Sequence, residues 1–101
     1  DPDKDGLAPA DVERFLTELP AKLTVSGFMT MPAFAADPQQ SRPAFDALRR
    51  LRDELAPRLA GRHDLHALSM GTSQDFAVAV EEGATFVRLG TVLFGPRVPR
   101  E

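Results

Sequence analysis

Glycine and hydroxyl residues gather at the ends of two apolar runs in the last third of the chain. Ser69 ends the first run and is followed by Gly71, while Gly90 and Thr91 follow the second run. In β/α barrels, phosphate groups commonly lie over the loops after the last two strands, where backbone N–H groups approach closely and hydroxyls complete the cradle. The pattern favours a phosphate-binding edge. Spacing alone leaves open that the glycines only serve turns and the hydroxyls only cap helices.

Arg88 is the second residue that could do chemistry, because it interrupts an otherwise apolar run at 85–89. A guanidinium in a buried strand must be paired or must point at a ligand, since leaving it unpaired costs several kcal/mol. The two interpretations that remain are a ligand contact and a salt bridge to an acidic residue at the edge of the sheet.

Other candidate sites are weaker. Asp1, Asp3, Asp5 and Gly6 imitate the start of a calcium loop, but the twelfth position is Val12 instead of an acidic residue. The chain has no cysteine, which excludes disulfides and thiolate chemistry. His63 and His66 have no partners at metal-ligand spacing, so no metal site is predicted. The methionines on strands, Met29, Met31 and Met70, are more typical of core than of ligand contacts.

Helices and strands must alternate to position these residues. We expect a first helix near 9–19, with Val12, Phe15, Leu16 and Leu19 on its buried face and Pro20 ending it. After a loop at 33–40, Ser41 and Pro43 open a second helix whose buried stripe runs Phe45, Leu48, Leu51, Leu55 and Leu59. Pro57 is expected to kink it or end it early, with Gly61 as its stop. Ser73 is expected to cap a third helix that buries Phe76 and Val80 and ends at Gly83.

The expected strands are 23–31, 65–70 and 85–89. Strands separated by helices of this length imply right-handed parallel crossovers, which belong to a doubly wound sheet or to an arc of a barrel. We expect one structural unit over 1–101 without a linker.

Composition narrows the function classes. The net charge of −3 gives no basic face for nucleic acid, and no apolar run approaches a membrane span. We therefore expect neither partner, and a cytoplasmic location. The chain starts at Asp1 and not at Met, so we expect a fragment, a processed product or a trimmed chain.

Several segments carry one family's pattern: 68–76, 83–85 and 87–95 with Arg97, and also 4–6, 27–30 and 42–45. Together they resemble the pyridoxal phosphate homeostasis proteins (YggS/PROSC-like), whose barrel is related to the N-terminal domain of alanine racemase. The departures are Thr72, where the family usually has Met, and Phe28, where Leu is common.

The resemblance implies that this chain is the C-terminal portion of a (β/α)8 TIM-type barrel that binds pyridoxal 5′-phosphate. By position, Ser69, Gly90 and Thr91 would hold the cofactor phosphate, with Met70 beside them, and Arg88 would face the pyridine nitrogen. The resemblance implies a cofactor carrier with no catalytic residues, not an enzyme.

The family's Schiff-base lysine lies on an early strand, before the part that this sequence resembles. The chain has two lysines, Lys4 and Lys22, and neither matches that residue. We therefore expect the chain alone to be empty or to hold only phosphate or sulfate. We also expect it to self-associate or to associate with the missing N-terminal half. The alternatives are a barrel fragment of a pyridoxal-phosphate-dependent racemase or decarboxylase, which should carry a catalytic tyrosine, and a stand-alone phosphate-ligand or interaction module. The chain contains no tyrosine.

Overall fold

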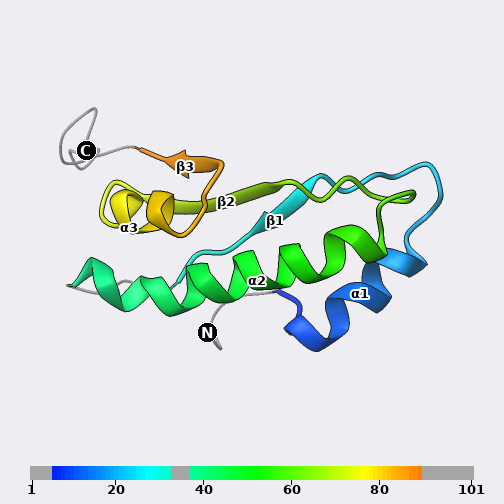
Figure 1. The fold of residues 1–101 in the computed structure, drawn as a ribbon, viewed down its shortest axis with the longest axis horizontal. Coiled ribbons are helices and arrows are strands. Elements are labelled where there is room, and N and C mark those ends of the chain that lie inside the picture. Colours follow the sequence, from blue (N-terminus) through cyan, green and yellow to red (C-terminus); the bar gives the residue numbers. More distant parts are fainter. Residues whose placement is uncertain (1–5, 33–36, 90–101) are drawn as a thin grey trace, which may run out of the picture.

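A computed structural model describes residues 6–32 and 37–89. Three strands form one sheet, with α2 and α3 against one of its faces and α1 beside the C-terminal part of α2 (Figure 1). The elements in chain order are α1 (Pro9–Glu18), β1 (Gly27–Met29), the 3-10 turn η1 (Pro38–Ser41), α2 (Arg42–Arg58), β2 (Ala67–Thr72), α3 (Phe76–Glu81) and β3 (Phe86–Arg88).

The sheet is parallel throughout, in the order β1-β2-β3, which confirms the predicted parallel α/β class. Phe28 pairs with Leu68, and Ser69 pairs with Met29 on one side and Phe86 on the other. The strands are shorter or shifted compared with the prediction, which placed them at 23–31, 65–70 and 85–89. Before Gly27 the chain runs beside a loop and not beside a strand, so only isolated backbone bonds form there, such as Asp64 N–H to the Val25 carbonyl at 3.2 Å.

The first two helices largely follow the sequence pattern. Leu16 is buried on α1, but Phe15 is 47% exposed, so the prediction that Phe15 faces the core was wrong. On α2 the predicted stripe is buried or half-buried, and the helix ends at Arg58, one residue after Pro57 and before the expected stop at Gly61. The missing Pro57 N–H removes one bond near the helix end, where Leu59 N–H still bonds to Leu55 at 3.0 Å.

The start of α2 also differs from the expectation. Ser41 makes no side-chain capping bond, and the expected loop instead ends in η1. Asp37 caps that turn by accepting the Gln39 N–H at 2.9 Å. A turn that is already helical leads directly into α2, so a side-chain cap at Ser41 is not required.

The third helix begins at Phe76, and Ser73 is not its cap. Its contact with the sheet is made by Val78 and Ala79, which are buried against Leu68 and Met70. Phe76 is half-buried, but Val80 is 58% exposed, so the prediction that Val80 faces inward was wrong. Gly83 ends the helix as predicted, at φ +102°. Its N–H bonds to the Val80 carbonyl at 3.0 Å, and Ala84 N–H bonds to Ala79 at 2.9 Å, the paired bonds of a Schellman motif.

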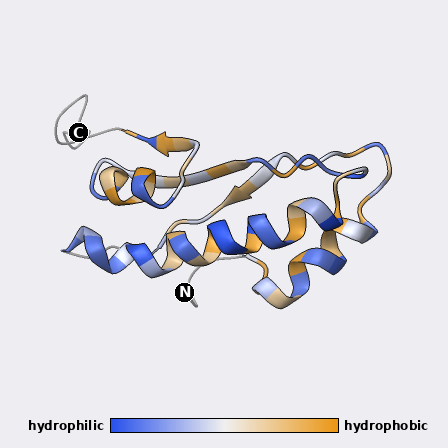
Figure 2. Ribbon diagram, in the orientation of Figure 1, coloured by the Kyte–Doolittle hydropathy of each residue, from blue (hydrophilic) through white to orange (hydrophobic). Residues whose placement is uncertain are grey.

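The core lies on the helix side of the sheet, and no helix of the described residues covers the opposite face. One cluster joins β2 to α2 and α3 through Phe45, Leu68, Met70, Val78 and Ala79. A second joins α1 to the C-terminal half of α2 through Leu16, Leu55, Leu59 and Leu65. The apolar colouring of the helices follows these contacts (Figure 2).

The methionines divide between the two faces of the sheet. Met70 is fully buried, as a core residue should be, but Met29 is 61% exposed and Met31 49% exposed, so the prediction of a core role for these two was wrong. Phe86, on the same register line as Met29, is also 61% exposed. The physical reason is that no described helix covers this second face.

His63 holds three segments together in the second cluster, and its sequence context gave no sign of this. Its ring is 3% exposed. Nδ1 accepts the Val25 N–H at 3.0 Å, and Nε2 lies 2.8 Å from the Leu16 carbonyl oxygen, to which it can only donate. Its own backbone N–H bonds to Leu59 at 2.8 Å. These partners fix a neutral ring with its proton on Nε2.

Candidate functional site

A pocket of about 160 Å³ lies at the carboxyl edge of the sheet. Because all three strands are parallel, their carboxyl ends meet at this edge, as the sequence pattern required. The wall opposite the strand ends comes from η1, through Pro38 and the buried Ser41. Its lining residues are Thr30, Met31, Pro32, Pro38, Ser41, Gly71, Thr72, Gln74, Asp75 and Arg88.

The turn after β2 forms one side of this pocket. Gly71 has φ +102°, and a Cβ there would lie 2.6 Å from the Ala79 Cβ, so the turn requires glycine for both conformation and space. The Asp75 carboxylate then folds back on the turn, accepting the Thr72 N–H at 2.8 Å and lying 3.4 Å from the Thr72 hydroxyl. The Gln74 N–H points at the same hydroxyl at 3.3 Å.

Arg88 crosses the open face of the sheet at the carboxyl edge. It starts from β3, and its guanidinium lies 3.0 Å from the Met29 sulfur and 3.5 Å from the Thr30 carbonyl oxygen, both beyond the intervening β2. Among the residues that the structure describes, no carboxylate forms an ion pair with Arg88, so the predicted alternative of a salt bridge is not found there. A half-buried cation with such weak acceptors is suited to an anionic or hydrogen-bond-accepting ligand.

The other predicted site residues divide among three places. Ser69 is partly buried in mid-strand, on the opposite face of β2 from Leu68 and Met70, and does not line the pocket. Met70 follows it with its side chain in the core. Gly90 and Thr91 lie outside the described residues, as do Arg97 and the acidic segment 1–5. The cofactor contacts assigned to these residues stay predictions.

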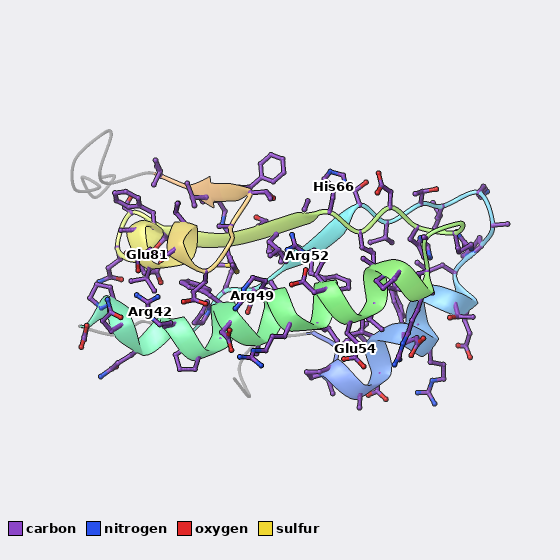
Figure 3. The ribbon with its side chains drawn as sticks, viewed as in Figure 1. Arg42, Arg49, Arg52, Glu54, His66 and Glu81 are labelled. Carbon is purple, nitrogen blue, oxygen red and sulfur yellow. The ribbon has the colours of Figure 1, made fainter. Side chains whose placement is uncertain are left out.

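A network of ion pairs joins the first half of α2 to the end of α3, next to the pocket residue Ser41. Arg42, at the start of α2, donates to Glu81 at the end of α3 at 2.6 Å (Figure 3). It also donates to Glu82, the residue after α3, at 2.6 Å and to the Gln39 side chain at 2.9 Å. The hydrogen bonds to Glu81 and then Glu82 raise the pKa of Arg42 above its already high ordinary value. Arg49 extends the network, 2.5 Å from Asp46 and 3.5 Å from Glu82.

Sequence reasoning missed Asp75 and Ser41 as pocket residues. Asp75 lies within the matched 68–76 segment but reads as an ordinary polar residue before a helix. For Ser41 the sequence predicts only a helix start. Both are brought to the pocket by η1 and the turn after β2, whose conformations have no periodic signal. Across residues 6–32 and 37–89, no three His, Cys, Asp or Glu side chains cluster as a metal site, and none of the described helices is long and apolar enough to cross a membrane.

This arrangement matches a known class of protein. The family "Alanine racemase, N-terminal domain" matches residues 3–98, and the chain belongs to this family. A solved structure of PipY from Synechococcus elongatus PCC7942 without pyridoxal phosphate superposes with a TM-score of 0.81 at 37% identity, over 94% of this chain and 45% of that one. PipY with pyridoxal phosphate bound superposes with a TM-score of 0.75 at 33% identity, over 92% of this chain and 44% of the other.

Curated relatives point to the same group within that family. A pyridoxal phosphate homeostasis protein of Aquifex aeolicus is 46% identical over 97 residues, which are 93% of this chain and 41% of that protein. The human protein of the same name is 41% identical over 98 residues, covering 93% of this chain and 36% of the relative. The family resemblance predicted from the sequence is thereby confirmed. The chain spans about two fifths of the length of these relatives.

Proposed function

We propose that the chain is the part of a pyridoxal-phosphate carrier that binds the cofactor noncovalently, and that it does not catalyse a reaction. The observation that carries this is Arg88, a cation without a carboxylate partner among the described residues, lining a pocket at the carboxyl edge of a parallel sheet. Ligands bind at this edge in β/α barrels. The relatives are named for homeostasis of the cofactor and not for a reaction, which supports a carrier.

The pocket fits part of the cofactor. Its volume of about 160 Å³ is below the roughly 300–1,000 Å³ of complete small-molecule sites, so it can take a phosphate group with little beyond it. Thr30, Ser41 and Thr72 bring hydroxyl groups to its lining, and Arg88 brings a positive charge. The remaining surface would come from residues of this chain outside the described ranges, Gly90 and Thr91 among them, and from the part of the relatives that this chain does not span.

The family resemblance assigns a role to each residue: Ser69, Gly90 and Thr91 would hold the phosphate, with Met70 beside them, and Arg88 would face the pyridine nitrogen. Ser69 does not line the pocket and Gly90 and Thr91 lie outside the described residues, so the described hydroxyl contacts proposed for a phosphate in the pocket are those of Thr30, Ser41 and Thr72. Pyridoxal phosphate supplies an electron-withdrawing ring when its nitrogen is protonated. A guanidinium beside that nitrogen disfavours its protonation, because two neighbouring positive charges repel. Such a site is better suited to keeping and delivering the cofactor than to carbanion chemistry.

The open face of the sheet supports a (β/α)8 barrel of which this chain is the C-terminal portion. Met29 and Phe86 are each 61% exposed on it, and β1 and β3 are both edge strands. We propose that a preceding half, bearing the lysine that bonds covalently to the cofactor, closes over this face. Lys22 is exposed and comes before the amino end of β1, whereas the pocket lies at the carboxyl edge of the sheet, so it is not suited to that role. Self-association through the same face is the alternative, and a cytoplasmic location stays a prediction.

Reconstitution tests the proposal. The chain is mixed with the remainder of the Aquifex aeolicus relative, the part outside the matched region, and titrated with pyridoxal phosphate while its visible absorbance is followed. We expect the mixture to bind the cofactor and neither half alone to do so with comparable affinity. Arg88→Gln should weaken binding, whereas Arg50→Gln, which removes the same charge from a 75% exposed side chain on α2, should not. A mixture that binds no cofactor, or an equal effect of both substitutions, would contradict the proposal.

A further inference from the structure

The pocket contains one negative charge that a phosphate site does not obviously need. Its only charged lining residues are Arg88 and Asp75, so the described lining is electrically neutral overall. Sites that bind phosphate usually present an excess of donors and positive charge. The position of the Asp75 carboxylate inside such a pocket therefore calls for an explanation.

The Asp75 carboxylate occupies the donors that an anion would use. It accepts the Thr72 N–H at 2.8 Å and lies 3.4 Å from the Thr72 hydroxyl, which is the arrangement that a phosphate oxygen could also make. Asp75 is partly buried, so water screens its charge only in part. A phosphate entering the pocket must either displace the carboxylate from Thr72 or bind beside it against like-charge repulsion.

We propose that Asp75 is a built-in competitor for the phosphate group and sets how weakly the pocket holds it. This inference rests on the proposed function and explains a property that a carrier needs, since a cofactor that is to be delivered must also be released. The positive charge of Arg88 favours binding of the anionic ligand, and the negative charge of Asp75 lowers the affinity. Asp75 thus sets the affinity of the pocket for the phosphate group in addition to forming the turn.

Asp75→Asn removes the negative charge of the side chain and keeps the hydrogen bond that forms the turn. The asparagine side-chain oxygen can still accept the Thr72 N–H, so the turn keeps its hydrogen bond while the charge is removed. A neighbouring unit charge commonly shifts an ionisation by one pKa unit or more, which corresponds to about a tenfold change in an equilibrium constant. We expect Asp75→Asn to tighten binding of a phosphate group about tenfold.

The first experiment uses the isotope-labelled chain and inorganic phosphate, with the Thr72 amide signal followed by NMR. Asp64→Asn is the matched control, because it removes the same charge from a side chain that is 85% exposed and does not line the pocket. Tighter binding in Asp75→Asn, together with an unchanged Asp64→Asn, supports the proposal. Equal or weaker binding in Asp75→Asn, or no phosphate response of the Thr72 amide in either protein, overturns it.

The second experiment uses the reconstituted protein with pyridoxal phosphate and with pyridoxal, which lacks the phosphate. A charge effect at the phosphate predicts tighter pyridoxal phosphate binding in Asp75→Asn with pyridoxal unchanged, and equal tightening of both ligands would contradict it. If the wild-type mixture binds no cofactor, the proposed function fails, while the phosphate titration still decides the role of Asp75.

Discussion

Replacing His63 should destabilise the chain more than its distance from the pocket suggests. The Leu16 carbonyl, near the end of α1, would bond to the N–H four residues later, but that residue is Pro20, which has none. The His63 ring supplies the missing donor at 2.8 Å and accepts the Val25 N–H at 3.0 Å. His63→Ala leaves both backbone groups unpaired in a buried place and opens a cavity.

The expected magnitude follows from these losses. Each buried group left without a partner costs about 1–3 kcal/mol, so the two together should lower the free energy of unfolding by about 3 kcal/mol or more. Urea unfolding followed by circular dichroism measures this, since the chain has no Trp or Tyr for fluorescence. His66→Ala is the control, with a side chain 64% exposed and an expected change below about 0.5 kcal/mol.

A third variant distinguishes the polar loss from the cavity. His63→Phe fills most of the ring volume but can neither donate to Leu16 nor accept from Val25. If the hydrogen bonds dominate, His63→Phe should be about as destabilised as His63→Ala. A His63→Phe protein close to wild-type stability would show that packing and not hydrogen bonding explains the effect, and a His63→Ala change under about 1 kcal/mol would refute the reasoning as a whole.

Three further predictions concern the turn glycines and two arginines. Gly71→Ala should lower the free energy of unfolding in urea by more than about 2 kcal/mol, and by more than Gly83→Ala does. Both glycines have φ +102°, but only a Cβ at Gly71 would lie 2.6 Å from the Ala79 Cβ. Equal effects of the two substitutions would contradict the steric argument. Arg62→Ala should lower the free energy of unfolding by about 1–2 kcal/mol and Arg62→Lys by a large part of that, because the guanidinium donates to the carbonyls of Leu19, Pro20 and Leu23 in the segment after α1 and an ammonium cannot span them. A lysine variant as stable as wild type would count against this. Because the pKa of Arg42 is raised on folding, its contribution to stability is complete at every pH below the ordinary pKa of arginine and is lost only above it. The effect of Arg42→Gln on the unfolding midpoint should therefore be constant from about pH 6 to about pH 10. A decline of that effect toward the alkaline end of this range would contradict this.

Local periodicity explains why much of the fold could be predicted. The stripe from Phe45 to Leu59 repeats at helical spacing, so α2 and its buried face were evident from the sequence. Pro9 and Gly83 mark a helix start and a helix end through backbone restrictions that need no tertiary contact. Alternation of helices and strands then implied parallel pairing, and parallel pairing implied that the strand ends meet at one edge.

Other features depend on contacts between distant residues. The burial of Val78 in place of Val80 depends on which side of α3 packs against β2, where Val78 and Ala79 meet Leu68 and Met70. The exposure of Met29 depends on which face of the sheet the helices cover, which a three-residue strand cannot encode.

The candidate site divides in the same way. The sequence by itself determined the residue types: a cation in an apolar strand at Arg88, and glycines and hydroxyls at the strand ends, because these choices conflict with plain core packing. Only the tertiary structure decided that Arg88 reaches across β2 to Thr30, that Ser41 closes the pocket and that the Asp75 carboxylate lies on the Thr72 amide. Each of these depends on how segments far apart in the chain, or an irregular turn, are placed in space, and neither leaves a periodic trace in the sequence.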